Sequence, residues 1–299
     1  MNSLRANNNE IVMRHFSLLL LLQTLFLLPL SQASADEVVL SLSNGKQGVA
    51  DFRPGSKEKP AVLLLHGFLQ TNQFSTIQLM ADELATSNYT VLAPTLTLNI
   101  SQRRNSLGCN AVQNHRADDS RREISDWFAW LKKQGYPRII AIGHSSGSMR
   151  LLHYLSEKPA ILPQQFIAVS IGPINSQLDS PKMQQHIRQA KEHISKNDPQ
   201  IDHYSLGFCR NNYAAPAQAY LSYIAWNEQW VLQRLQNSPV PIHVVLGSAD
   251  SWVPAGWAAT LSSQAIPHTL LDGAGHNFSG TQEFEFQELI VNLVTPVGE

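Results

Sequence analysis

The segment 143–147, GHSSG, places Ser145 between two glycines, directly after the apolar run 138–142 and before a stretch with helical spacing. A serine on a tight strand-to-helix turn presents its hydroxyl above the sheet, and flanking glycines let the strand and the helix pack closely around it. A bare G-x-S-x-G match is common by chance, so its setting decides the interpretation. The setting favours a nucleophile at Ser145 over a Gly/Ser-rich loop without chemistry.

A serine hydroxyl is a weak nucleophile and needs a base that takes its proton. His276 is the candidate base, because it lies in the glycine-rich segment GAGHNF after the last expected strand. Asp250 follows another expected strand and would orient that base. The order Ser, Asp, His along the chain is one in which such triads occur. Asp272 is the competing acid, and we expect it to brace the histidine loop instead.

Attack by serine on a carbonyl places negative charge on an oxygen, which needs backbone N–H donors. We expect one donor at Ser146, directly after the nucleophile, and the other at Phe68, in the segment HGFL after the apolar run 61–65. We expect His66 to pack and form hydrogen bonds rather than act as a base.

The elements that must position these residues alternate between strand and helix. Apolar runs predict strands at 61–65, 89–93, 138–142, 165–171, 241–246 and 268–271, after an initial hairpin of 38–42 and 47–52. Helical spacing predicts helices at 76–87, 117–134, 146–155, 254–262 and 282–294. This alternation predicts an α/β fold with a mostly parallel, doubly wound sheet.

Residues 172–239 interrupt the alternation and read as a small helical lid insert. They contain a polar helical run at 181–196, an aromatic loop and an amphipathic run at 216–235. Two interpretations of the aromatic residues stay open: they line an acyl pocket, or they form the core of the lid. These residues are Tyr204, Phe208, Tyr213, Trp226 and Trp230.

The N-terminus has the features of a secretory signal peptide, with a basic flank, an apolar run at 16–30 and a small-residue site that ends at Ala35. We expect residues 1–35 to be the signal peptide and residues 36–299 to be the α/β domain, located in the periplasm or secreted. The alternative is an uncleaved signal anchor.

Cys109 and Cys209 are the two cysteines of the chain. Export favours a disulfide between them over two free thiols.

Four segments in order, LLLHGF, GHSSG, GSAD-x-x-VP and GAGHNF, resemble the serine esterase and lipase branch of the α/β-hydrolase fold. The likeness runs from about residue 40 to 294, apart from the insert. It implies this fold, the triad of Ser145, Asp250 and His276, and acyl transfer without a metal. One departure is the single glycine of HGF, where some lipases and esterases have HGGG.

The net charge of −1 gives no support for a nucleic-acid partner. No metal cluster or cofactor motif stands out in the sequence. The partner expected is therefore a small-molecule or lipid ester, with no stable membrane span after signal cleavage. The sequence does not define the oligomeric state. The alternatives are a non-catalytic binding protein with the same fold, and a peptidase or thioesterase with the same triad.

Overall fold

This computed structural model describes residues 35–174 and 180–295. The predicted signal peptide lies outside the described residues, except for Ala35. Within the described ranges, no helix is long and apolar enough to cross a membrane.

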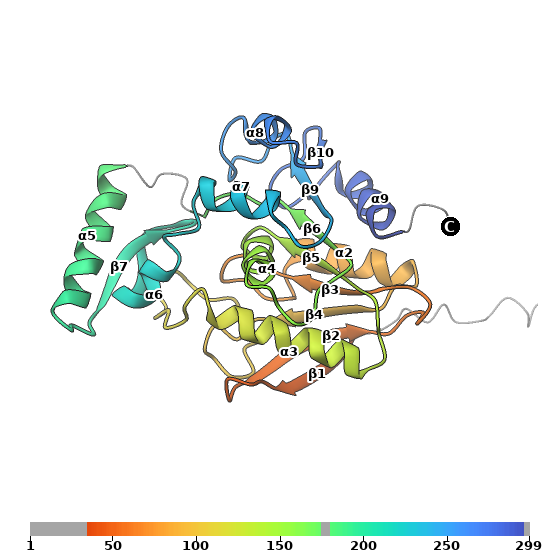
Figure 1. The fold of residues 1–299 in the computed structure, drawn as a ribbon, viewed down its shortest axis with the longest axis horizontal. Coiled ribbons are helices and arrows are strands. Elements are labelled where there is room, and N and C mark those ends of the chain that lie inside the picture. The colour runs from red at the N-terminus through yellow and green to blue at the C-terminus, as the bar shows by residue number, and fades with distance from the viewer. Residues whose placement is uncertain (1–34, 175–179, 296–299) are drawn as a thin grey trace, which may run out of the picture. The chain divides into compact units, whose positions relative to one another are not determined.

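An eight-stranded sheet with the order β1-β2-β4-β3-β5-β6-β9-β10 forms the centre of the described chain (Figure 1). Its strands are β1 (Asp36–Ser41), β2 (Gln47–Arg53), β3 (Ala61–Leu65), β4 (Val91–Thr95), β5 (Ile139–His144), β6 (Gln165–Val169), β9 (Ile242–Gly247) and β10 (His268–Leu271). β1 and β2 form an antiparallel hairpin, and β2 also runs antiparallel to β4. All pairs from β4 to β10 are parallel. The mostly parallel sheet and its antiparallel start are therefore as predicted.

Helices cover both faces of the sheet, which makes it doubly wound. They are α2 (Ser75–Thr86), α3 (Asp119–Lys133), α4 (Ser146–Ser156), α8 (Trp257–Ser263) and α9 (Glu283–Val294). Apolar side chains of α3, α4 and α8 belong to one core cluster, and those of α2 and α9 belong to another. β3 contributes to both clusters because all five of its side chains are buried, as its unbroken apolar run AVLLL predicts.

The insert packs on the α3 and α4 side and contains a hairpin that the sequence analysis did not predict. Its elements are α5 (Pro181–Ser195), β7 (Ile201–Leu206), β8 (Cys209–Pro216), α6 (Ala217–Ser222) and α7 (Glu228–Gln236). The aromatic loop is the antiparallel pair β7–β8, in which Tyr204 and Tyr213 face each other and are buried. The amphipathic run 216–235 forms two helices, because the Asn227 side chain caps a new helix by accepting a hydrogen bond from the Trp230 backbone amide.

Candidate functional site

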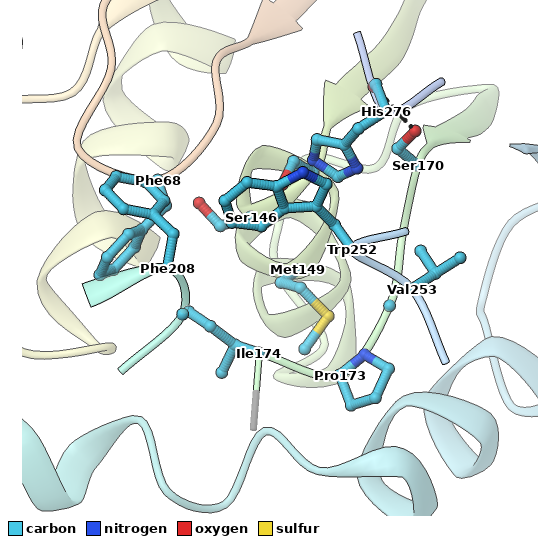
Figure 2. A pocket seen from close by; sticks show the side chains of 13 residues that line it. Phe68, Ser146, Met149, Ser170, Pro173, Ile174, Phe208, Trp252, Val253 and His276 are labelled. Carbon is cyan, nitrogen blue, oxygen red and sulfur yellow. Dashed lines mark hydrogen bonds between the residues drawn. The ribbon is translucent and has the colours of Figure 1, made fainter. Parts of the chain in front are cut away.

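The parallel strands β3, β5, β6, β9 and β10 all end at one edge of the sheet, where open α/β sheets bind their ligands. Loops after four of them, β3, β5, β6 and β9, together with the segment after β10, line a cavity of about 110 Å³. Ser145 and Ser146 from the β5 end, Phe68 from the β3 end and His276 from the β10 end all contribute to it. Figure 2 shows Phe68 and Phe208 together on one side of this cavity and His276 with Ser170 on another.

Ser145 lies on a sharp turn with φ 55° and ψ −122°, and α4 begins at the next residue. A non-glycine residue adopts such a backbone only where its surroundings impose it, which is frequent at functional sites. The flanking glycines are required here. A Cβ on Gly143 would lie 2.5 Å from the Ser148 amide nitrogen, and one on Gly147 would lie 2.4 Å from the Leu65 carbonyl oxygen. The GHSSG segment therefore forms the strand–turn–helix that the sequence analysis expects.

His276 and Asp250 form the closest pair of the site. His276 Nδ1 lies 2.8 Å from Asp250 Oδ2 and 3.0 Å from Oδ1, and the Asp250 side chain is fully shielded from solvent. Burial acts to raise the pKa of this carboxyl, but the hydrogen bond and charge of His276 and the Trp252 amide outweigh it, so the pKa is lowered. Asp250 is therefore held as a carboxylate. Asp272 accepts a hydrogen bond from Ser248 Oγ instead, 3.0 Å away.

Ser145 and His276 line the same cavity. In the described part of the chain, Ser145 Oγ and the His276 ring do not form a hydrogen bond within normal geometry. Bonds of this kind are often long in ligand-free structures and shorten when the substrate binds. The pairing of His276 Nδ1 with Asp250 leaves the Nε2 atom as the ring nitrogen available to a hydroxyl or a substrate.

Two residues that the sequence analysis missed hold the main chain of His276. His144 Nε2–H donates to the His276 carbonyl oxygen at 2.8 Å, and Ser170 Oγ donates to the same oxygen at 3.1 Å. Ser170 has a left-handed backbone, with φ 48°, directly after β6. Its place at the end of an expected strand was the one signal available. His144 is the second residue of GHSSG, where the motif itself sets no requirement.

Burial lowers the pKa of His144 to about 4, and the nearby His276 ring adds to the effect. The pKa of a histidine in the unfolded chain is about 6.5. Because the pKa of His144 is lower in the folded protein, protonation favours the unfolded chain, so the free energy of unfolding is highest above pH 6.5 and decreases as the pH falls toward 4. The contribution of His144 between pH 7 and pH 5 is on the order of 2 kcal/mol.

We expect His144→Gln to reduce the loss of unfolding free energy between pH 7 and pH 5 by this amount, because glutamine stays neutral. Urea denaturation of both proteins at the two pH values measures it. Titrating groups that do not interact with His144 cancel in the difference between the two proteins. Parallel pH dependences would show that His144 does not titrate as described.

The two residues predicted as oxyanion donors, Phe68 and Ser146, line the same cavity as Ser145. In residues 35–174 and 180–295, neither the Phe68 amide nor the Ser146 amide donates a hydrogen bond to another protein group, and both residues line the cavity. His66 links the loop that contains Phe68 to the end of β4. Its Nδ1–H donates to the Gly67 carbonyl, and its Nε2 accepts from the Leu96 backbone amide. Both ring nitrogens of His66 are thus occupied, which agrees with the structural part expected for it.

Of the five lid aromatics, Phe208 lines the cavity, and the other four are buried within the fold. Phe208 packs edge-to-face with both Phe68 and Trp252, at 5.4 and 5.8 Å between ring centroids. Trp252 in turn lies 5.7 Å from the His276 ring. The described residues contain no cluster of three or more His, Cys, Asp or Glu side chains that could hold a metal ion.

Cys109 and Cys209 form a disulfide with Cα atoms 5.6 Å apart. It joins the loop before α3 to the first residue of β8. The bond therefore connects the insert to the body of the domain, and the predicted disulfide is confirmed.

The profile of the alpha/beta hydrolase family matches residues 62–286. No sequence among curated proteins matches the chain. Est1E from Butyrivibrio proteoclasticus is 15% identical, with a TM-score of 0.59, over 87% of this chain and 97% of its own. The alpha/beta hydrolase GrgF from Penicillium sp. sh18 has a TM-score of 0.66 at 14% identity, over 87% and 97%. A thioesterase domain from the curacin biosynthetic pathway has 0.57 at 19% identity, over 87% and 99%. At these identities the likeness shows the fold.

Proposed function

This chain belongs to the alpha/beta hydrolase family, and we propose that it is an exported serine hydrolase that cleaves a carboxylic ester through an acyl-enzyme on Ser145. One observation supports this most strongly. His276 is hydrogen-bonded through Nδ1 to the buried carboxylate of Asp250 and lines the same cavity as Ser145. Nucleophile, base and orienting acid are the arrangement that acyl transfer needs.

In the proposed reaction, His276 Nε2 takes the proton of Ser145 Oγ while Oγ forms a bond to the ester carbonyl carbon. The tetrahedral intermediate collapses, the bond to the alcohol oxygen breaks, and His276 gives its proton to the departing alcohol. Water then attacks the acyl carbon with His276 as base, and the acid leaves as Ser145 regains its proton. Asp250 holds the imidazole orientation and stabilises its protonated form.

The amides of Phe68 and Ser146 are the proposed donors to the negative oxygen of the intermediate. Ser146 is the first residue of α4, so its N–H has no partner within the helix. The positive end of the helix dipole also points toward this position. Phe68 is kept in place by the His66 contacts and by its ring packing on Phe208.

Covalent labelling tests the proposal. We expect the mature protein to react with a fluorophosphonate probe, and peptide mass spectrometry to place the adduct on Ser145. Ser145→Ala should remove the adduct, whereas Ser176→Ala, outside the motif, should retain it. A folded protein that forms no adduct, or one labelled at another serine, would favour the non-catalytic binding protein with the same fold.

Export is proposed from the signal-like N-terminus together with the disulfide between the two cysteines of the chain. Disulfides persist in oxidising compartments such as the periplasm or the cell exterior. N-terminal sequencing of the protein from the producing cell checks this, with Asp36 expected as the first residue. A chain that begins at Met1 or Met13 would contradict signal cleavage.

A further inference from the structure

A second, larger cavity of about 630 Å³ lies beside the nucleophile pocket. The two cavities share four lining residues, of which Phe208 and Trp252 carry the large side chains. Both rings are accessible to solvent, at 40% and 56%. A pocket of about 110 Å³ is below the range of about 300–1,000 Å³ typical of small-molecule sites. A substrate of ordinary size therefore does not fit in the first cavity alone, and the larger cavity beyond Phe208 and Trp252 is the adjoining space into which it can extend.

The larger cavity carries positive charge. Lys182, in the first turn of α5, and Arg210, in β8, both line it and are exposed. None of the described residues that line the cavity is acidic. Neither cation forms an ion pair with a carboxylate elsewhere in the described chain. Two cations in a concave site that have no carboxylate partner among the described residues attract an anion and raise its local concentration.

Asn211 adds a neutral hydrogen-bond donor to this lining. Asn211 Oδ1 accepts a hydrogen bond from Ser205 Oγ, and the Asn211 backbone N–H donates to the same hydroxyl oxygen. This arrangement turns the carbonyl side of the Asn211 side chain toward Ser205 and leaves its NH₂ group as a donor. A charged oxygen in the cavity would thus meet guanidinium, ammonium and amide donors, a set typical of carboxylate and phosphate recognition.

We propose that this cavity binds an anionic group, a carboxylate or a phosphate, at the end of the substrate remote from the scissile carbonyl. This inference rests on the proposed ester hydrolysis. The reacting carbonyl would lie at Ser145, an apolar spacer would pass over the packed rings of Phe208 and Trp252, and the anion would lie between Lys182 and Arg210. The anionic group takes no part in bond making or breaking.

Matched ester pairs test the selectivity. One pair places the charge on the acyl side, 4-nitrophenyl hemiadipate against its neutral amide counterpart, 4-nitrophenyl adipamate. The other places it on the alcohol side, 4-acetoxybenzoate against 4-acetoxybenzamide. A third anionic ester, 4-acetoxyphenyl phosphate, distinguishes phosphate from carboxylate. The readout is the ratio of kcat/KM for the charged ester to that for its neutral partner.

We expect a ratio of about ten or more at low ionic strength for at least one anionic ester, falling as salt is added. The double variant Lys182→Gln/Arg210→Gln should bring this ratio to about one. The control Arg188→Gln/Lys191→Gln removes the same charge from exposed positions of α5 that do not line the cavity. It should keep the ratio of the unmodified protein.

Calorimetry separates failure of this inference from failure of the proposed hydrolysis. The catalytically blocked Ser145→Ala protein is titrated with 4-acetoxybenzoate and with 4-acetoxyphenyl phosphate, and the binding should weaken about tenfold when Lys182 and Arg210 are also replaced. Hydrolysis with ratios that the double variant leaves unchanged would overturn the anion site but not the hydrolase. Absence of hydrolysis, with anion binding that depends on both cations, would overturn the hydrolase and keep the site. Absence of such binding would overturn the site in either case.

Discussion

Replacement of Ser145 by alanine is expected to lower kcat/KM for a hydrolysed ester by about 10⁴- to 10⁶-fold, because no acyl-enzyme can form. His276→Ala should have an effect of similar size, since the hydroxyl then has no base. The double variant should be no worse than either single variant, because groups that act as a unit are strongly non-additive. Initial rates on a 4-nitrophenyl ester, at protein concentrations high enough to measure the residual activity, give all three values.

Replacement of Asp250 tests the choice of the acid. Asp250→Asn retains the size of the side chain but lets an amide face His276 Nδ1, which favours the wrong imidazole tautomer. A loss of about 10⁴-fold is expected from that change. The matched control is Asp272→Asn, because Asp272 is exposed and accepts only from Ser248 among the described hydrogen bonds of its carboxylate. A larger loss in Asp272→Asn than in Asp250→Asn would reverse the assignment of the two carboxylates.

The elements that position the site could be predicted because each candidate residue follows an apolar run. A strand buried on both faces has no polar alternation, so the run AVLLL gives the bounds 61–65 in both sequence and structure. The edge strand HTLL also has its predicted bounds, 268–271, although Leu270 is exposed. Parallel strands then place the residues that follow them at one edge of the sheet. The closeness of His276 and Asp250 follows from β9 and β10 being neighbours.

The bounds of a strand were less predictable where its first residues form hydrogen bonds with the preceding helix. The predicted strand 89–93 is displaced to Val91–Thr95 in the structure. The Tyr89 amide donates to the Leu84 carbonyl and so closes the end of α2, which removes Tyr89 from the strand. At the other end, Thr95 pairs with Val49 of β2, a contact that apolar composition alone does not indicate.

The β7–β8 hairpin and the second cavity depend on contacts between distant segments. The strand at 201–206 contains Asp202, His203 and Ser205, so it lacks the composition of a typical strand. It forms because Tyr204 and Leu206 are buried among lid side chains. Lys182 and Arg210 come from segments 28 residues apart and share a cavity through this packing. Ser170 was missed for a similar reason, since only the folded loop shows its hydroxyl beneath the His276 carbonyl.

Removal of the disulfide is expected to cost about 3–4 kcal/mol of unfolding free energy, because it closes a loop with a sequence separation of 100 residues. The double variant Cys109→Ala/Cys209→Ala should melt about 10 °C lower than the unmodified protein. Scanning calorimetry of both proteins, with and without dithiothreitol, measures this. Reduction of the unmodified protein should reproduce the loss, and the double variant should not respond to the reductant.

The disulfide should also affect activity below the melting transition, because it lies in a continuous chain of contacts to the loop that contains Phe68, a proposed oxyanion donor. The Leu107 amide donates to the Leu69 carbonyl, and Cys109 follows two residues later. Across the bond, Phe208 directly precedes Cys209 and packs on Phe68. The backbone hydrogen bonds that join Ala214 to Cys109 and Gln113 remain in the variant, so the hairpin should stay attached but less precisely placed.

We therefore expect kcat/KM of the Cys109→Ala/Cys209→Ala variant to fall about tenfold or less at 25 °C. An unchanged rate together with a lowered melting temperature would limit the disulfide to a stabilising part, and no change in either would show that the lid is held without it.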